Sequence, residues 1–282
     1  MTTYYDPTTS IPSNLITQPN IIPQPNFPQQ IFQQIYQPVV LPKQATPSLS
    51  EAFKPKRAGK NKSHIIFILD DSLSMQKCRD NTISGFNEYL KGQQEDARAT
   101  GIETFVSLYK FDGSSVKCTI DHANVQEVAL LTRDNYNPLG ATNLLDAIGG
   151  VMMQINTKLS ASEKKNRESV IITILTDGEE NSSSTFGNDD IKAMVEKAEG
   201  KNWGFMFLGA NINAFSAGSK LGFGVNNTIQ YDTQGTANAI RTASAATSRM
   251  KSAYASGMET SLTYASMGFT EEERTMAVTK DV

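Results

Sequence analysis

Three uninterrupted apolar runs constrain the fold of this chain most strongly. They are "HIIFILD" (64–70), "SVIITIL" (169–175) and "WGFMFLGA" (203–210). A strand covered on both faces, as in a parallel sheet, is apolar throughout and does not alternate. Segments with helical periodicity separate the runs, at about 75–97, 143–159, 188–200, 212–221 and 236–256. Strands alternating with helices predict a doubly wound α/β domain, with a mostly parallel central sheet and helices on both faces.

Weaker patterns extend this sheet. "ETFVSLYKF" (103–111) predicts a strand, and the Asp112-Gly113 turn predicts a hairpin to an edge strand within "SSVKCTIDHANV". A further weak strand is expected at 227–232. Asn188 or Asp189 is the expected cap of the helix at 188–200, and Gly200 its expected end. The last 25 or so residues are polar and poorly patterned.

The prolines set the N-terminal part of the chain apart. Ten of the eleven lie between Pro7 and Pro55, and glutamine is dense in the same segment. Proline fixes φ and removes a backbone donor, so this segment is expected to be an extended arm. Large apolar side chains are frequent, and Asp6 and Lys43 are the only charges before Glu51. Such an arm is expected to bind neighbouring subunits or its own body; a disordered linker is the alternative.

A basic run, "KPKRAGKNK" (54–62), ends the arm. It fits a solvated hinge, with contact to nucleic acid or an acidic surface as the alternative. The predicted divisions are therefore an arm and hinge at 1–62, an α/β domain at 63–256 and a C-terminal tail at 257–282.

Composition excludes several classes of function. The net charge is −3 and the isoelectric point about 5.5, which does not favour nucleic-acid binding. No apolar run approaches the roughly 18 residues of a membrane span, and the N-terminus lacks a secretory signal pattern. Cys78 and Cys118 form no CxxC motif and are expected to be buried or half-buried thiols. His64 and His122 are too isolated in sequence to be proposed as ligands or bases, and Trp203 is expected to pack in the core.

Oxygen-bearing side chains gather where the predicted strands end. Asp70, Ser72 and Ser74 follow the first apolar run, and Asp177 follows the second. Thr142 lies at a predicted helix start between them. Ligands bind beyond the carboxyl ends of parallel strands, and two carboxylates with three hydroxyls suit a hard cation such as Mg²⁺. From the residues alone, Asp70 and Ser72 could instead cap the following helix, or Asp70 could be a nucleophile.

At these residues the chain resembles a known family. "DDSLSM", the threonine of "PLGATNLLDA" and the aspartate of "TDGEEN" are similar, in order and spacing, to the metal-ion-dependent adhesion site (MIDAS) of von Willebrand factor A (vWA) domains. The resemblance implies a vWA fold over about 63–256. It implies that the hydroxyls of Ser72, Ser74 and Thr142 contact Mg²⁺ (or Mn²⁺ or Ca²⁺), and that Asp70 and Asp177 bind it directly or through water. A carboxylate from a protein partner would complete the shell.

One residue departs from the family pattern. Leu73 stands where many relatives have glycine, and its side chain is expected to point away from the metal, towards a rim. Asp71, Glu179 and Glu180 are expected to be acidic rim residues. Asp146 is expected on the helix surface or as a local hydrogen-bond partner.

No enzymatic activity is predicted. Phosphotransferases with an aspartate nucleophile need a second acid two residues later, and that position is Ser72. No GxGxxG or GxxxxGK[ST] motif indicates nucleotide binding. An Mg²⁺-dependent phosphotransferase using Asp70 is the remote alternative.

The expected function is a metal-dependent protein-protein interaction module that acts as a structural or assembly component. The arm would tether it to neighbouring subunits, because bacteriophage virion components often carry such arms. The segment "FLGANINAF" (207–215) resembles that of bacterial and phage-encoded vWA proteins. A cytoplasmic vWA adaptor working with an ATPase is the alternative. The expected location is the cytoplasm or a virion.

Overall fold

The computed structural model describes residues 61–161, 168–201, 203–258 and 267–278. The predicted arm therefore lies outside the described residues, apart from the end of its basic hinge. The strands are β1 (Lys62–Asp70), β2 (Glu103–Phe111), β3 (Val116–Asn124), β4 (Ser169–Thr176), β5 (Trp203–Ala210) and β6 (Thr228–Tyr231). The α-helices are α3 (Arg79–Thr100), α4 (Leu144–Ala161), α5 (Asn188–Glu199), α6 (Ala214–Lys220), α7 (Thr236–Ala255) and α9 (Glu271–Ala277), and the 3₁₀ turns are η1 (Leu73–Cys78), η2 (Val125–Glu127) and η4 (Val225–Asn227).

The six strands form one sheet in the order β3-β2-β1-β4-β5-β6. All neighbouring strands are parallel except β2 and β3, which form the expected antiparallel hairpin. The chain builds outward from β1 to one edge and then returns to add β4, β5 and β6 on the other side. The doubly wound, Rossmann-like α/β fold predicted from the apolar runs is confirmed.

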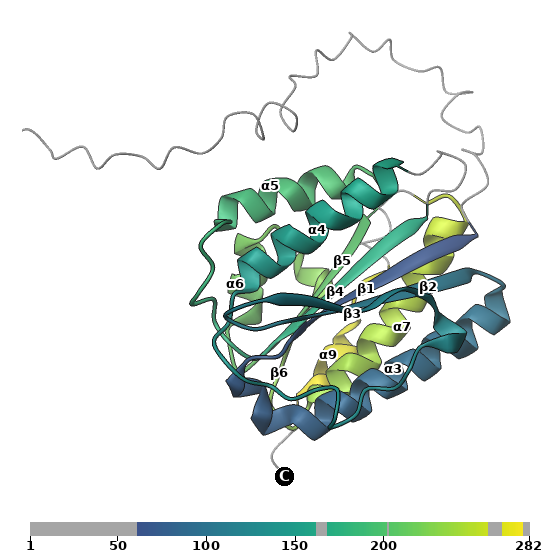
Figure 1. Cartoon of the computed structure of the whole chain (residues 1–282). Helices are drawn as coiled ribbons and strands as arrows, with labels where there is room; N and C mark the ends of the chain where they lie inside the picture. The colour runs from purple at the N-terminus through teal and green to yellow at the C-terminus, as the bar shows by residue number, and fades with distance from the viewer. Residues whose placement is uncertain (1–60, 162–167, 202, 259–266, 279–282) are drawn as a thin grey trace, which may run out of the picture. The chain divides into compact units, whose positions relative to one another are not determined.

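Helices cover both faces of the sheet (Figure 1). One face packs against α4, α5 and α6, and the opposite face against α3, α7 and α9. Each layer encloses its own apolar core: Ile66, Ile172 and Phe205 belong to the first, and Phe67, Ile171 and Met206 to the second. Successive residues of one strand thus enter opposite cores, which explains why the central strands contain no polar alternation. Trp203 is buried, as expected.

Local details depart from the sequence-based expectations. Helix α5 is capped at Gly187, not at Asn188 or Asp189, and its backbone N–H donates to Asp190 Oδ2 at 2.8 Å. Cys78 is buried, but Cys118 is exposed on β3, because edge strand β3 has most of its residues exposed. In the part of the chain that the structure describes, no helix is long and apolar enough to cross a membrane.

Helix α9 lies in the segment interpreted as a polar tail. Thr270 caps it, accepting from Glu273 N at 3.2 Å, while the Glu273 side chain accepts from Thr270 N at 2.9 Å. Phe269 and Ala277 are buried and belong to the core on the α7 side. Arg249 of α7 forms an ion pair with Glu273 at 2.7 Å. A short helix with few apolar residues has too weak a periodicity to be predicted, and these tertiary contacts stabilise it.

Candidate metal centre

The five predicted site residues come from three loops at the carboxyl end of the parallel strands. Asp70 is the last residue of β1. Ser72 directly precedes η1, and Ser74 lies within it. Asp177 follows β4, the strand next to β1, and Thr142 lies just before α4. Strand order reverses between β1 and β4. The carboxyl ends of the strands at such a switch point are the usual position for a ligand site in an open α/β sheet.

Asp70 is fully buried, and both of its carboxylate oxygens are engaged. Oδ1 accepts from Ser72 N at 2.8 Å, and Oδ2 accepts from the Thr176 hydroxyl at 2.6 Å. Burial raises the pKa of Asp70 to about 6; the hydrogen bonds from Ser72 and Thr176 oppose the rise, and the nearby Asp177 adds to it. A buried carboxylate held in this way orients the loop that follows it.

The hydroxyls of Ser72 and Ser74 continue this network to the next strand. Their Oγ atoms lie 3.1 Å apart, and Ser74 Oγ donates to Asp177 Oδ1 at 2.6 Å. Asp177 is mostly buried, and burial raises its pKa as well. Four of the five predicted residues therefore form one continuous hydrogen-bonded chain, Asp70–Ser72–Ser74–Asp177.

The loop after β4 holds Thr142 close to Ser74 and Asp177. Its backbone N–H donates to Asn181 Oδ1 at 3.0 Å, and its carbonyl accepts from Asn181 N at 3.2 Å. A Cβ placed on Gly178 would lie 3.1 Å from Thr142 Oγ1 and 3.5 Å from Ser74 Oγ. These two hydroxyls therefore flank the same small space beside Gly178. All five predicted residues converge.

The residues fit a hard divalent cation. Two buried carboxylates lie close enough for the charge of one to raise the pKa of the other. Within the described ranges, neither forms an ion pair with a lysine or arginine side chain. Buried charges are normally paired or bound to metal, and hydroxyl and carboxylate oxygens are the ligands that Mg²⁺ prefers. These residues could therefore hold such an ion, which would supply a positive centre for oxygen ligands.

Two acidic residues near the site support its loops. Glu180 accepts from the backbone N–H groups of Leu145, Ser182 and Ser183 at 2.9, 2.8 and 2.6 Å. It therefore links the first turn of α4 to the loop after β4, and its expected role as a rim residue is wrong. Asp146 accepts from three backbone N–H groups of the same loop, at 184–186, and is the local hydrogen-bond partner that was expected.

The rim of the site combines apolar and charged side chains. Leu73 is 57% exposed and Leu139 is 65% exposed. Their loops are held together, because Leu73 N donates to Gly140 O at 3.0 Å and Leu139 N donates to Asp71 O at 2.7 Å. Asp71 is half-buried, and its carboxylate lies 3.5 Å from Lys110 Nζ. Leu73 is thus exposed beside the site, as expected.

The geometry is unfavourable for the alternative in which Asp70 is a nucleophile. Its side chain is fully buried and both oxygens accept hydrogen bonds. Ser72 occupies the place of the second acid, and its hydroxyl lies against Ser74. A nucleophile needs an accessible oxygen and a nearby general acid, and this arrangement presents neither at Asp70.

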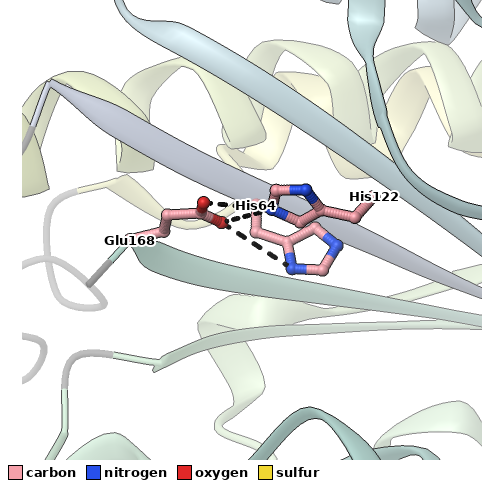
Figure 2. A group of neighbouring side chains, drawn as sticks. All are labelled: His64, His122 and Glu168. Atoms are coloured by element: carbon pink, nitrogen blue, oxygen red, sulfur yellow. Dashed lines mark hydrogen bonds and ion pairs between the residues drawn. The ribbon is translucent and has the colours of Figure 1, made fainter. Parts of the chain in front are cut away.

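A second polar cluster lies near the start of β1, at the opposite end of the strand from Asp70. Figure 2 shows its three side chains. His64, His122 and Glu168 place ligand atoms within 4.8 Å of one another. The expectation that both histidines are isolated is wrong, since their ring centroids lie 4.7 Å apart. Sequence reasoning missed the cluster because its members come from three strand ends far apart in the chain. The local signal was in "CTIDHANV", where the adjacent polar residues Asp121 and His122 interrupt the alternation of apolar and polar residues.

The fold of this chain is similar to those of several solved structures. No protein-family model matches the sequence, and no curated protein matches it significantly. A von Willebrand factor type A structure from Catenulispora acidiphila has a TM-score of 0.46 and 12% identity over 67% of this chain and 43% of that chain. Proximal thread matrix protein 1 from the mussel byssus, with a zinc-occupied MIDAS motif, has a TM-score of 0.43 and 13% identity over 65% and 47%. Manganese-loaded TRAP protein from Plasmodium vivax has a TM-score of 0.43 and 14% identity over 64% and 72%.

The match spans less than half of the first two of these chains. At identities of 12–14%, none of these resemblances assigns a function to the present chain. The functional argument therefore depends on the site geometry.

Proposed function

We propose that this protein is a metal-dependent protein-protein interaction module. In this proposal Ser72, Ser74 and Thr142 bind Mg²⁺ through their hydroxyls, and Asp70 and Asp177 bind it directly or through water. The observation that carries the proposal is the convergence of three loops on two buried carboxylates, neither of which forms an ion pair with a lysine or arginine side chain in the described part of the chain. The three hydroxyl ligands carry no charge and do not fill the six positions that Mg²⁺ prefers, so the ion can take an additional anionic oxygen.

The rim suggests what kind of partner brings that oxygen. Leu73 and Leu139 are exposed apolar side chains on two loops that are hydrogen-bonded to each other beside the site. A partner that places an Asp or Glu carboxylate on the ion would bury one or both leucines if apolar residues flanked its acid. Burial of one leucine contributes about 1.5–3 kcal/mol, enough to select such a sequence over an acid alone.

A selection experiment tests this function without a known partner. Random peptides displayed on phage would be selected on the Mg²⁺-loaded protein, with the Asp70→Ala/Asp177→Ala variant as the counter-selection. We expect the recovered peptides to share an Asp or Glu next to an apolar residue and to be released by EDTA. Peptides that lack an acid, or that remain bound in EDTA, would refute the proposal.

A more specific proposal is that this interaction module is an assembly component, such as a virion protein, tethered by its N-terminal arm. Its support is the arm's composition, which combines many apolar side chains with only two charges before Glu51. An arm of this kind favours contact with other subunits in the cytoplasm or in a particle over free solution. The proposal assigns no catalytic activity, consistent with the inaccessible Asp70.

Removing the arm tests the tether. A chain lacking residues 1–60 is expected to keep the cooperative unfolding and Mg²⁺ affinity of the full chain but to lose higher-order assembly, measured by analytical ultracentrifugation. If the assembly state is unchanged by the deletion, the tether hypothesis is wrong, while the metal site is unaffected.

A further inference from the structure

We propose that His64, His122 and Glu168 form a second metal site, selective for Zn²⁺ or a similar transition-metal ion. It lies where the parallel strands begin, whereas the candidate Mg²⁺ centre lies where they end. His64 is the third residue of β1, and Asp70 is its last. At about 3.3 Å per residue, the two sites are roughly 20 Å apart, so each can be tested without the other.

The three donors already face one another. His122 Nε2 lies 2.9 and 3.0 Å from the two Glu168 carboxylate oxygens, and His64 Nδ1 lies 3.9 Å from Glu168 Oε2 (Figure 2). The longer separation exceeds a hydrogen bond, but an ion with bonds of about 2.0–2.2 Å to nitrogen and oxygen would bridge it. Tetrahedral binding places ligand atoms about 3.4 Å apart, so the His122–Glu168 contact must open by about 0.5 Å and the His64–Glu168 separation must close by a similar amount.

The backbone is distorted at the position that aims His122 into the cluster. Strand pairing shifts between Val106 and Leu108, so that Ser107 of β2 lies opposite a bulge in β3 at 121–122. His122 has a φ of 48°, in the left-handed region that non-glycine residues rarely adopt. Its ring stacks on Phe105 with centroids 4.2 Å apart. Bulges often re-aim side chains beside functional sites, and local strain of this kind costs about 1–3 kcal/mol.

Ser107 is placed to orient both histidines. Its Oγ accepts from His122 N at 2.9 Å and lies 2.8 Å from His64 Nε2. When His64 Nδ1 binds an ion, the ring proton is on Nε2, which can donate a hydrogen bond to Ser107 Oγ. Metal-binding histidines usually have such a partner for the second ring nitrogen, because it fixes the tautomer and the ring orientation.

The donor set indicates the class of ion. Two imidazole nitrogens and one carboxylate suit Zn²⁺ and related ions, whereas Mg²⁺ prefers oxygen alone. The side chain of His64 is 3% exposed, that of Glu168 10% and that of His122 41%. An ion can therefore enter past His122, and a fourth position remains for water or another ligand. An ordinary His122–Glu168 ion pair would account for two of these groups but not for the buried His64 nitrogen that faces the same carboxylate.

The histidine rings themselves provide the test. The chain has only two histidines, so long-range ¹H–¹⁵N NMR of the imidazoles reports this cluster alone. On titration of the full chain with Zn²⁺, we expect both rings to shift together and saturate at one equivalent, whereas Mg²⁺ should leave them unchanged. The Asp70→Ala/Asp177→Ala variant should show the same Zn²⁺ response. His122→Gly, which removes the ligand and relieves the positive φ, and Glu168→Gln, which preserves shape, should each weaken zinc affinity at least about 10-fold.

Two results would overturn the second site. One is the absence of any ring shift with stoichiometric Zn²⁺. The other is a shift of His122 alone, which would mean that an exposed imidazole binds the ion without His64. Neither result bears on the Mg²⁺ centre, so this inference and the proposed function fail separately.

Discussion

Ser74 Oγ donates a 2.6 Å hydrogen bond to Asp177 Oδ1, although the two residues are 103 positions apart. This bond joins the loop after β1 to the loop after β4, the two neighbouring strands at the switch point of the sheet. It places a hydroxyl and a carboxylate in contact at the position where Thr142 also arrives. Tests of the candidate centre therefore start from this pair.

Asp177→Asn should weaken Mg²⁺ binding by at least about 10-fold, measured by isothermal titration calorimetry. The change keeps the size of the side chain and removes one of the two negative charges that face the ion. Asp71→Asn is the matched control, because Asp71 is paired with Lys110 and is not part of the hydrogen-bonded chain. Equal affinities of the two variants would show that Asp177 does not bind the ion.

Asp70→Asn should change the pH dependence of stability in the metal-free protein. Folding raises the pKa of Asp70 from 3.8 to about 6, so the folded state holds this proton more tightly than the unfolded chain. The stabilising contribution of Asp70 is therefore complete below about pH 4 and is lost as the pH rises through 6. In EDTA, the variant should match the wild type at pH 4 and exceed it at pH 8, by at most about 3 kcal/mol.

Urea denaturation at both pH values measures this difference. With saturating Mg²⁺ at pH 8 the order should reverse, because only the wild type gains stability from the bound ion. A variant that is less stable than the wild type at pH 8 in EDTA would show that the Asp70 charge is compensated without metal.

Gly178→Ala should lower Mg²⁺ affinity several-fold, because the new Cβ would lie 3.1 Å from Thr142 Oγ1 and displace a proposed ligand. Gly150→Ala is the matched control, since no atom lies within 4 Å of a Cβ at that position of α4. The control should bind Mg²⁺ normally and be more stable by up to about 1 kcal/mol, the usual gain from alanine in a helix. Unchanged Mg²⁺ affinity in Gly178→Ala would place the ion away from Thr142.

Glu180→Ala should destabilise the fold by about 1–3 kcal/mol, because it leaves backbone N–H groups of α4 and the following loop without their acceptor. Chemical denaturation measures the loss, with Glu179→Ala as the control, since Glu179 is exposed. If both variants unfold at the same urea concentration, the hydrogen bonds of Glu180 contribute nothing to stability.

The sequence predicted the central sheet and the convergence of the five site residues because both depend on local signals. Apolar runs such as 64–70 identify buried strands, and parallel strands bring their carboxyl ends to one edge. The contacts it missed depend on register and packing. His64 and His122 meet only because of a bulge in β3, and Glu180 reaches α4 through the fold of its loop. Helix α9 depends on its contacts with α7, which sequence periodicity does not report.

The most direct test of the central claim is the anomalous scattering of Mn²⁺ in crystals of the full chain. The account predicts one peak within about 2–2.5 Å of the hydroxyl oxygens of Ser72, Ser74 and Thr142, and no such peak in Asp70→Ala/Asp177→Ala crystals. Wild-type crystals without a peak at these three hydroxyls, at saturating Mn²⁺, would contradict it.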